Sequence, residues 1–150
     1  MRAKAILFID DELGADQDTP DASYMSYYLQ ALRERGFQVM VATGADSALQ
    51  QLADNSENMG LIVLDIMMPP GKAFANDDTR GGLRTGVLLA EHIAQAYPDI
   101  PMMVLTNIPD PDERKEIESQ KNVVRTLFKP YCTPFELAQE VQDFVGSQDA

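Results

Sequence analysis

The chain of 150 residues has one cysteine, Cys132, and one histidine, His92. A single cysteine cannot form an internal disulfide, and such sparse use of cysteine is typical of proteins in a reducing compartment. We therefore expect a cytoplasmic protein. No motif places a histidine beside Cys132, so the sequence does not indicate a cysteine nucleophile activated by a neighbouring base.

Long apolar runs and positive charge are also scarce. No apolar run approaches the ~18–20 residues that a helix needs to cross a bilayer, and we expect no membrane contact. Twelve Lys and Arg stand against 24 Asp and Glu, which gives a net charge of −12. Because such a chain repels phosphate backbones and contains no basic patch, a nucleic-acid partner is not expected either.

Short apolar runs and amphipathic stretches alternate along the whole chain. The expected strands cover residues 5–9, 37–42, 61–65, 102–105 and 123–128. The expected helices run from about residue 21 or 23 to 35, over a short stretch capped by Asp46, over 86–97 and 110–120, and onward from Thr133-Pro134. Five such alternations predict an α/β fold with parallel strands, right-handed crossovers and helices on both faces of the sheet.

The stretch most informative about function is Leu61-Ile62-Val63-Leu64-Asp65, which leads into Ile66-Met67-Met68-Pro69-Pro70. Four consecutive apolar residues suit a strand that is buried on both faces. The run ends on a carboxylate, and functional groups in open parallel sheets gather beyond the carboxyl ends of the strands. Asp65 is therefore the first candidate for chemistry.

Other polar side chains follow the remaining strands. Asp10 and Asp11 come after the first strand, Thr106 after the fourth and Lys129 after the fifth. If the strands are parallel, all of these side chains lie at one edge, where a group of carboxylates favours a hard cation such as Mg²⁺. An ammonium and a hydroxyl beside them would suit a phosphoryl group on Asp65, and aspartyl phosphates are established intermediates of carboxylate catalysis.

Four segments in this order resemble the receiver domain of two-component response regulators. They are Ile9-Asp10-Asp11-Glu12, Leu64-Asp65-Ile66-Met67-Met68-Pro69, Leu105-Thr106-Asn107 and Phe128-Lys129-Pro130-Tyr131. The resemblance covers essentially the whole chain and implies a stand-alone, single receiver domain over residues 1–150. It also implies the flavodoxin-like (CheY-like) fold, a doubly wound five-stranded parallel sheet in the order 2-1-3-4-5 with five helices.

The resemblance further implies roles for individual residues. Asp65 would accept a phosphoryl group from a histidine kinase or phosphotransfer protein. Asp10, Asp11 and Asp65 would hold Mg²⁺ together with the Met67 backbone carbonyl. Thr106 and Lys129 would contact the phosphoryl oxygens, and the Lys129–Pro130 peptide bond would be cis.

The output face in this family is formed by the helix over 110–120, the fifth strand and the last helix. Phosphorylation would shift an existing equilibrium at this face toward binding of a downstream protein target, with the chain as a monomer or a phosphorylation-dependent homodimer. Only Ile117 is a large apolar residue in the 110–120 helix, so we expect this helix to be weakly held. Such a protein is not an enzyme in the usual sense, since it catalyses only its own phosphorylation and dephosphorylation.

The chain departs from the family pattern in three places. The connection over about 70–85 is about a dozen residues longer than the family's, well beyond ordinary connections in α/β units. The loop over about 12–21 is also long. Position 126 holds Thr126, where the family usually has an aromatic switch residue. Three basic residues of the longer connection suit phosphate neutralisation or partner docking, although such charges more often keep a loop solvated: Lys72, Arg80 and Arg84.

Two other functions compete with the phosphoacceptor interpretation. The long loops and Thr126 are compatible with a receiver-like interaction module that works without phosphorylation. A phosphatase resembling the haloacid dehalogenase family would also use an aspartyl nucleophile. That family requires a second aspartate two residues after the first, where this chain has Met67.

Overall fold

All five strands of the computed structural model join one parallel sheet. The structure describes residues 4–14, 24–107 and 110–148. The strands are β1 (Ala5–Ile9), β2 (Val39–Ala42), β3 (Met59–Asp65), β4 (Met102–Thr106) and β5 (Val123–Phe128). They lie in the order β2-β1-β3-β4-β5, and every neighbouring pair is parallel. This confirms the predicted fold class and strand order.

Helices connect the strands as the sequence pattern predicts. The described helices are α1 (Met25–Glu34), α2 (Ala45–Asn55), α3 (Thr85–Ala96), α4 (Pro111–Glu118) and α5 (Pro134–Gln148). Short 3₁₀ turns cover Asp11–Gly14, Ser56–Asn58 and Lys129–Tyr131. The predicted start of the first helix at residue 21 or 23, and most of the predicted loop over 12–21, lie outside the described residues. No helix in the described part of the chain is long and apolar enough to span a membrane.

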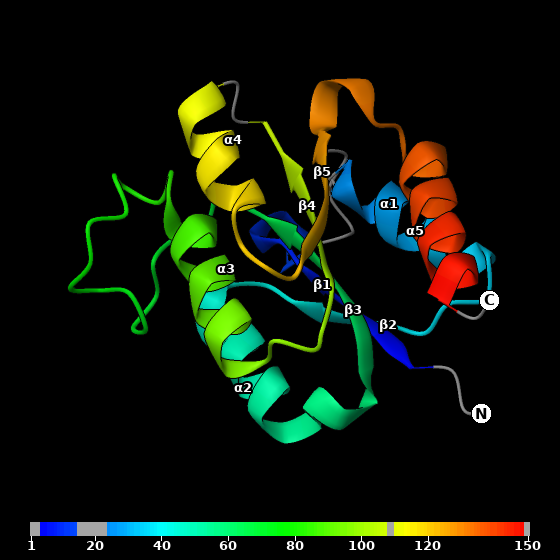
Figure 1. Cartoon of the computed structure of the whole chain (residues 1–150), viewed down its shortest axis with the longest axis horizontal. Coiled ribbons are helices and arrows are strands. Elements are labelled where there is room, and N and C mark those ends of the chain that lie inside the picture. The colour runs from blue at the N-terminus through cyan, green and yellow to red at the C-terminus, as the bar shows by residue number, and fades with distance from the viewer. Residues whose placement is uncertain (1–3, 15–23, 108–109, 149–150) are drawn as a thin grey trace.

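The sheet forms the middle layer of three, with α2, α3 and α4 on one side and α1 and α5 on the other (Figure 1). Side chains of a strand alternate between the two faces. Leu7 and Ile9 accordingly join the core beneath α2 and α3, whereas Ile6 and Phe8 join the core beneath α1 and α5. Burial of both faces explains why the strands appear in the sequence as continuous apolar runs.

Side chains cap the first turns of α4 and α5. The carboxylate of Asp110 accepts a hydrogen bond from the Asp112 N–H at 2.9 Å, and the Thr133 hydroxyl accepts one from the Glu136 N–H at 3.1 Å. Such bonds satisfy N–H groups that have no partner within the first helical turn.

The prediction that Asp46 caps the second helix is wrong. The helix begins one residue earlier, at Ala45, so Asp46 lies inside its first turn. Its carboxylate instead accepts hydrogen bonds from the backbone N–H groups of Lys72 and Ala73, both at 2.8 Å. These bonds lower the pKa of Asp46. Asp46 therefore links α2 to the beginning of the long β3–α3 connection by two hydrogen bonds.

The implied cis bond between Lys129 and Pro130 is also wrong, because no cis peptide bond occurs among the described residues. Pro130 instead lies in the 3₁₀ turn that starts at Lys129. The fixed backbone angle of proline suits the first turn of a helix, so a trans bond fits this local structure.

The start of α3 approaches the end of β3 so closely that only glycine fits at position 86. A Cβ atom on Gly86 would lie 2.3 Å from the Ile66 Cα and 2.7 Å from the Ile66 carbonyl oxygen. The Gly86 N–H also donates a hydrogen bond to that carbonyl at 2.8 Å. This contact fixes α3 against the segment that directly follows Asp65.

We expect Gly86→Ala to reduce the free energy of unfolding by about 1–3 kcal/mol, because the backbone must move to admit the methyl group. Gly146→Ala in α5 is the matched control, since a Cβ there meets nothing within 4 Å. The control should be neutral or stabilising by up to ~1 kcal/mol, as alanine favours a helix more than glycine does. Urea unfolding of both variants measures the difference, and equal stabilities would contradict the close approach.

Candidate functional site

The carboxylates predicted to gather at one edge of the sheet do lie together. Strand β1 pairs with β3, and the register that places Ile9 opposite Leu64 brings the next residues, Asp10 and Asp65, side by side. Asp11 follows at the start of the 3₁₀ turn. Carboxylate oxygens of Asp10, Asp11 and Asp65 all lie within 4.8 Å of one another. We call these three residues the acid cluster.

Lys129 brings a positive charge to the acid cluster from the far side of β4. Its Nζ lies 3.3 Å from Asp65 Oδ1 and 3.6 Å from Asp10 Oδ2. The Lys129 side chain is only 13% exposed, so water screens these interactions weakly. One ammonium thus serves two buried carboxylates.

Backbone N–H groups complete the polar contacts of the buried acids. The Glu12 N–H donates to Asp10 Oδ1 at 2.8 Å. The nearby Met67 backbone N–H lowers the pKa of Asp65. Asp10 Oδ2 is buried and has no hydrogen-bond partner among the described residues. A buried carboxylate oxygen without such a partner is costly, and a bound cation would relieve that cost.

The environment of the acid cluster raises the pKa of all three carboxyl groups. Burial, followed by the nearby charge of Asp65, raises the pKa of Asp10 to about 7. Burial is also the largest cause for Asp65, whose pKa rises despite the opposing effects of Lys129 and the Met67 N–H. The pKa of Asp11 rises because of burial and the charge of Glu12. Burial therefore makes the ionised form of these carboxyl groups costly.

These residues fit a divalent cation with oxygen ligands. When all three carboxyl groups are ionised, the single ammonium of Lys129 leaves two negative charges uncompensated. Mg²⁺ is bound through one or two carboxylates together with water and phosphate oxygens, which is the type of donor set found here. The role predicted for the Met67 carbonyl stays a prediction, since the Met67 contact that the structure shows is made by its N–H group.

The two threonines of the predicted site lie at different depths along their strands. Thr106 is the last residue of β4 and is fully buried, one residue beyond Leu105, which pairs with Asp65. It therefore reaches the same edge as the acid cluster. Thr126 pairs with Val104, two residues before the end of β5, and its hydroxyl is buried without a hydrogen-bond partner in the described chain.

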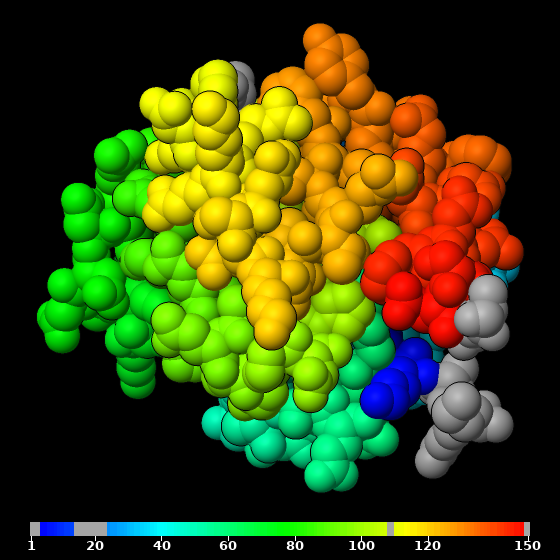
Figure 2. All heavy atoms as spheres, viewed as in Figure 1, coloured from blue at the N-terminus to red at the C-terminus, as the bar shows by residue number. Residues whose placement is uncertain are grey.

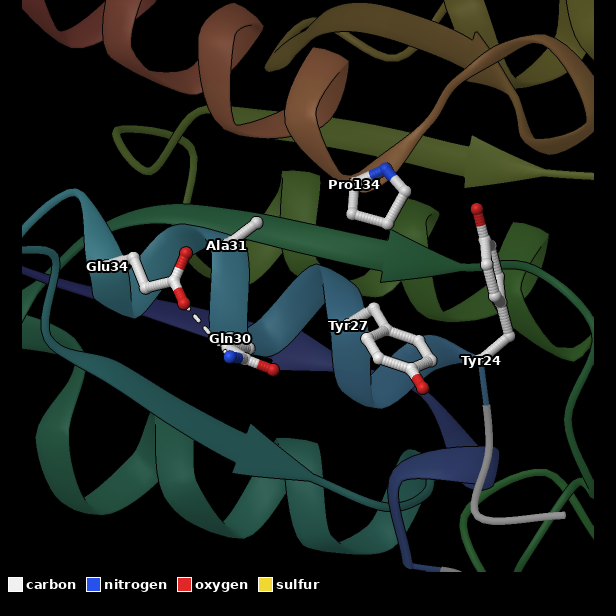
Figure 3. Close-up of a pocket in the computed structure, with 6 residues that line it drawn as sticks. All are labelled: Tyr24, Tyr27, Gln30, Ala31, Glu34 and Pro134. Atoms are coloured by element: carbon white, nitrogen blue, oxygen red, sulfur yellow. Dashed lines mark hydrogen bonds between the residues drawn. The ribbon is translucent and has the colours of Figure 1, made fainter. Parts of the chain in front are cut away.

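Two other features of the molecule lack comparable chemistry. Cys132 is 6% exposed, and burial raises the pKa of its thiol to about 11, so it is not an activated nucleophile. A shallow pocket beside α1 and the start of α5 is drawn in Figure 3; Tyr24, Tyr27, Gln30, Ala31, Glu34 and Pro134 line it. The carboxylate of Glu34 already accepts a hydrogen bond from the Gln30 amide at 2.9 Å. The acid cluster is thus the better candidate site.

Comparison with solved structures finds several response regulator receiver domains whose folds are similar to that of this chain. A CheY-like response regulator receiver domain protein from Methanospirillum hungatei JF-1 matches with a TM-score of 0.72 at 20% identity, over 99% of this chain and 98% of the other. The signal receiver domain of an HD domain-containing protein from Pseudomonas fluorescens Pf-5 matches with a TM-score of 0.72 at 22% identity, over 99% and 98% of the two chains. A two-component response regulator from Clostridium difficile has a TM-score of 0.72 at 18% identity, over 98% and 99%.

No family model matches the sequence, and no curated protein does. The solved structures therefore establish the fold, and they bear out at that level the resemblance inferred from the motifs. The function has to be argued from the acid cluster and its surroundings.

Proposed function

We propose that residues 1–150 act as a single receiver domain of a two-component or phosphorelay system, in which Asp65 accepts a phosphoryl group. The observation that carries this proposal is the acid cluster with the Lys129 Nζ 3.3 Å from Asp65 Oδ1. A nucleophilic carboxylate, a cation-binding pair of acids and a fixed ammonium are the groups that phosphoryl transfer to an aspartate needs. The phosphorylation-independent alternative gives no reason for such an arrangement.

In the proposed reaction an ionised oxygen of Asp65 attacks the phosphorus atom of the donor. The bond between phosphorus and a donor histidine nitrogen breaks, the imidazole keeps the electron pair, and the phosphoryl group remains on Asp65. Burial raises the pKa of Asp65, and Lys129 and the Met67 N–H oppose that shift and favour the ionised, nucleophilic form. Hydrolysis of the acyl phosphate by water then restores the carboxylate.

Asp10, Asp11 and Asp65, with the Met67 backbone carbonyl, would hold Mg²⁺ at this site. When bound, Mg²⁺ would neutralise charge on the phosphoryl oxygens during transfer. Lys129 and the hydroxyl of Thr106 would contact those oxygens from the other side. Together these groups stabilise the charge that develops in the transition state.

The proposed role is signalling, with catalysis confined to the chain's own phosphorylation and dephosphorylation. The phosphodonor would be a histidine kinase or phosphotransfer protein, and the phosphorylated chain would act on a downstream protein as a monomer or homodimer. The sparse cysteine content agrees with a cytoplasmic location. An acidic chain without a basic patch agrees with protein partners, and it gives no support to a nucleic-acid partner.

Intact mass spectrometry after incubation with Mg²⁺ and acetyl phosphate tests the proposal. We expect one phosphoryl adduct that requires Mg²⁺ and is absent from Asp65→Asn, because the amide cannot act as the nucleophile. Asp99→Asn is the matched control, since Asp99 is exposed and precedes β4 at the opposite edge of the sheet. It should label like the unmodified chain.

A chain that forms no adduct, while a known receiver domain labels under the same conditions, would contradict the proposal and favour the phosphorylation-independent module. An adduct of equal yield in Asp65→Asn would place the chemistry elsewhere.

A further inference from the structure

The segment over residues 79–86, which we call the strap, closes the long β3–α3 connection and touches two parts of the molecule. One end is held by the residues that directly follow Asp65. The Met68 N–H donates to the Gly82 carbonyl at 3.1 Å, and the Gly86 N–H donates to the Ile66 carbonyl at 2.8 Å. A Cβ on Gly82 would lie 2.7 Å from the Met68 carbonyl oxygen, so the two segments are in close backbone contact.

The strap is an ordered turn in its own right. The Arg84 and Gly82 N–H groups donate to the Thr79 carbonyl at 2.8 and 3.2 Å, and Thr79 is only 6% exposed. Arg80 has a φ of 53°, in the left-handed region that non-glycine residues rarely adopt. The side chain of Arg80 is largely exposed and forms an ion pair with Glu113 of α4. The backbone of the strap is therefore held by its own hydrogen bonds.

Both arginines of the strap form ion pairs with α4, which lies beside the strap in Figure 2. The Arg84 Nη2 lies 2.6 Å from Glu116 Oε2, and the Arg84 Nε lies 3.7 Å from Glu113 Oε1. Arg80 reaches the same Glu113 oxygen at 3.2 Å. The side chains of Arg84 and Glu113 are 20% and 14% exposed, so the pair between them is better shielded than an ordinary surface pair. Arg80 is 59% exposed and Glu116 is 38% exposed, so water screens the other two pairs more strongly. The expectation that these arginines only keep a loop solvated is wrong.

Helix α4 buries little apolar surface, and the Arg114 guanidinium adds a contact 5.9 Å from the centre of the Phe128 ring. Ile117 is its one buried residue, and all eight of its residues are described. Glu91 of α3 adds a further acid nearby: burial and the charge of Glu116 raise the pKa of Glu91. Without Arg84, Glu91 and Glu116 would repel each other across the α3–α4 contact. The strap thus adds ion pairs to a helix that has one buried apolar side chain.

We propose that the strap positions α4 by ion pairs and ties this helix to the backbone that directly follows Asp65. If Asp65 is the phosphoacceptor, as proposed above, a shift of residues 66–68 reaches α4 through Gly82, Gly86 and Arg84. Receiver domains usually couple the two regions through an aromatic side chain, and this chain has Thr126 at that position. The strap provides a second physical connection, and such coupling acts equally in both directions.

Hydrogen exchange of the α4 amides tests the tie without any ligand. In Arg84→Gln and in Glu116→Gln we expect exchange over residues 111–118 to accelerate by about three- to tenfold, because local opening becomes easier. The double variant should resemble Arg84→Gln, because that substitution already removes the pair with Glu116. Arg125→Gln is the matched control: its Nε lies 2.9 Å from Glu140 Oε2, but this pair joins β5 to α5.

Unchanged α4 exchange in Arg84→Gln would overturn the proposal, as would an equal increase in the Arg125→Gln control. The lifetime of the Asp65 acyl phosphate, measured in the same variants, tests coupling to the site. We expect this lifetime to change by about twofold or more in Arg84→Gln and not in Arg125→Gln. Faster α4 exchange with an unchanged lifetime would refute the coupling. If the unmodified chain does not label at all, the proposed phosphoacceptor function fails, and exchange alone still decides whether the strap holds α4.

Discussion

Asp10→Asn is expected to stabilise the protein at pH 8 in the absence of divalent cations, by about 2–4 kcal/mol. Burial and the charge of Asp65 raise the pKa of Asp10 from 3.8 to about 7. The folded chain therefore binds this proton more tightly than the unfolded chain does. Stability falls as the pH rises from about 4 to about 7, and at pH 8 the full cost of the buried charge is present. Asparagine keeps an acceptor for the Glu12 N–H but carries no charge.

Urea unfolding at pH 5 and pH 8 with EDTA measures this effect. The gain from Asp10→Asn should be less than half as large at pH 5 as at pH 8, whereas Asp99→Asn, an exposed acid, should show no gain at either pH. Mg²⁺ should stabilise the unmodified chain more at pH 8 than at pH 5, because its ligands must be deprotonated. Asp10→Asn should lose most of that stabilisation. A variant that is less stable than the unmodified chain at pH 8 would contradict the electrostatic account of the acid cluster.

Lys129→Gln is expected to destabilise the protein by about 3 kcal/mol at pH 8, since removing one partner leaves buried charge uncompensated. The Lys129 Nζ lies within 3.6 Å of both Asp10 and Asp65, and the ammonium is the cation closest to their buried oxygens among the described contacts. The loss should shrink at pH 5, where the buried acids are more protonated. Lys121→Gln, at an exposed position, provides the control.

The two substitutions should also depend on each other. In the Asp10→Asn background, Lys129→Gln should cost less than it does alone, because one of the two carboxylates has already lost its charge. Equal costs in both backgrounds at pH 8 would contradict a shared electrostatic site. Thermal unfolding of the four chains at pH 5 and pH 8 provides the comparison.

The sequence was sufficient to predict the sheet and the residues that lie at the carboxyl ends of its strands. Apolar runs such as Leu61–Leu64 show which segments are buried strands, and in a parallel sheet the residue after each strand reaches one edge. Asp10, Asp65 and Lys129 could therefore be placed together before any distance was known. The register of β1 and β3 then brings Asp10 and Asp65 side by side.

The sequence could not show which residues would form hydrogen bonds and ion pairs with the long β3–α3 connection. Asp46 lies 26 residues before its partner Lys72, and Arg84 lies 32 residues before Glu116. No periodicity links such positions, because the choice depends on how an irregular loop folds back. The contacts made by the backbone N–H groups of Glu12 and Met67 could not be predicted for a different reason. Every residue except proline has a backbone N–H group, so the residue type does not show which of these groups lies at the site.

Position-specific mapping of the phosphoryl group tests the central claim most directly. The chain is incubated with Mg²⁺ and acetyl phosphate, the acyl phosphate is reduced with borohydride, and the digested peptides are sequenced by mass spectrometry. Reduction converts a phosphorylated aspartate into homoserine, which marks the modified position. We predict homoserine at position 65, dependent on Mg²⁺ and absent from Asp10→Asn. Homoserine at Asp10, at Asp11 or at no position would contradict the assignment of Asp65 as the phosphoacceptor.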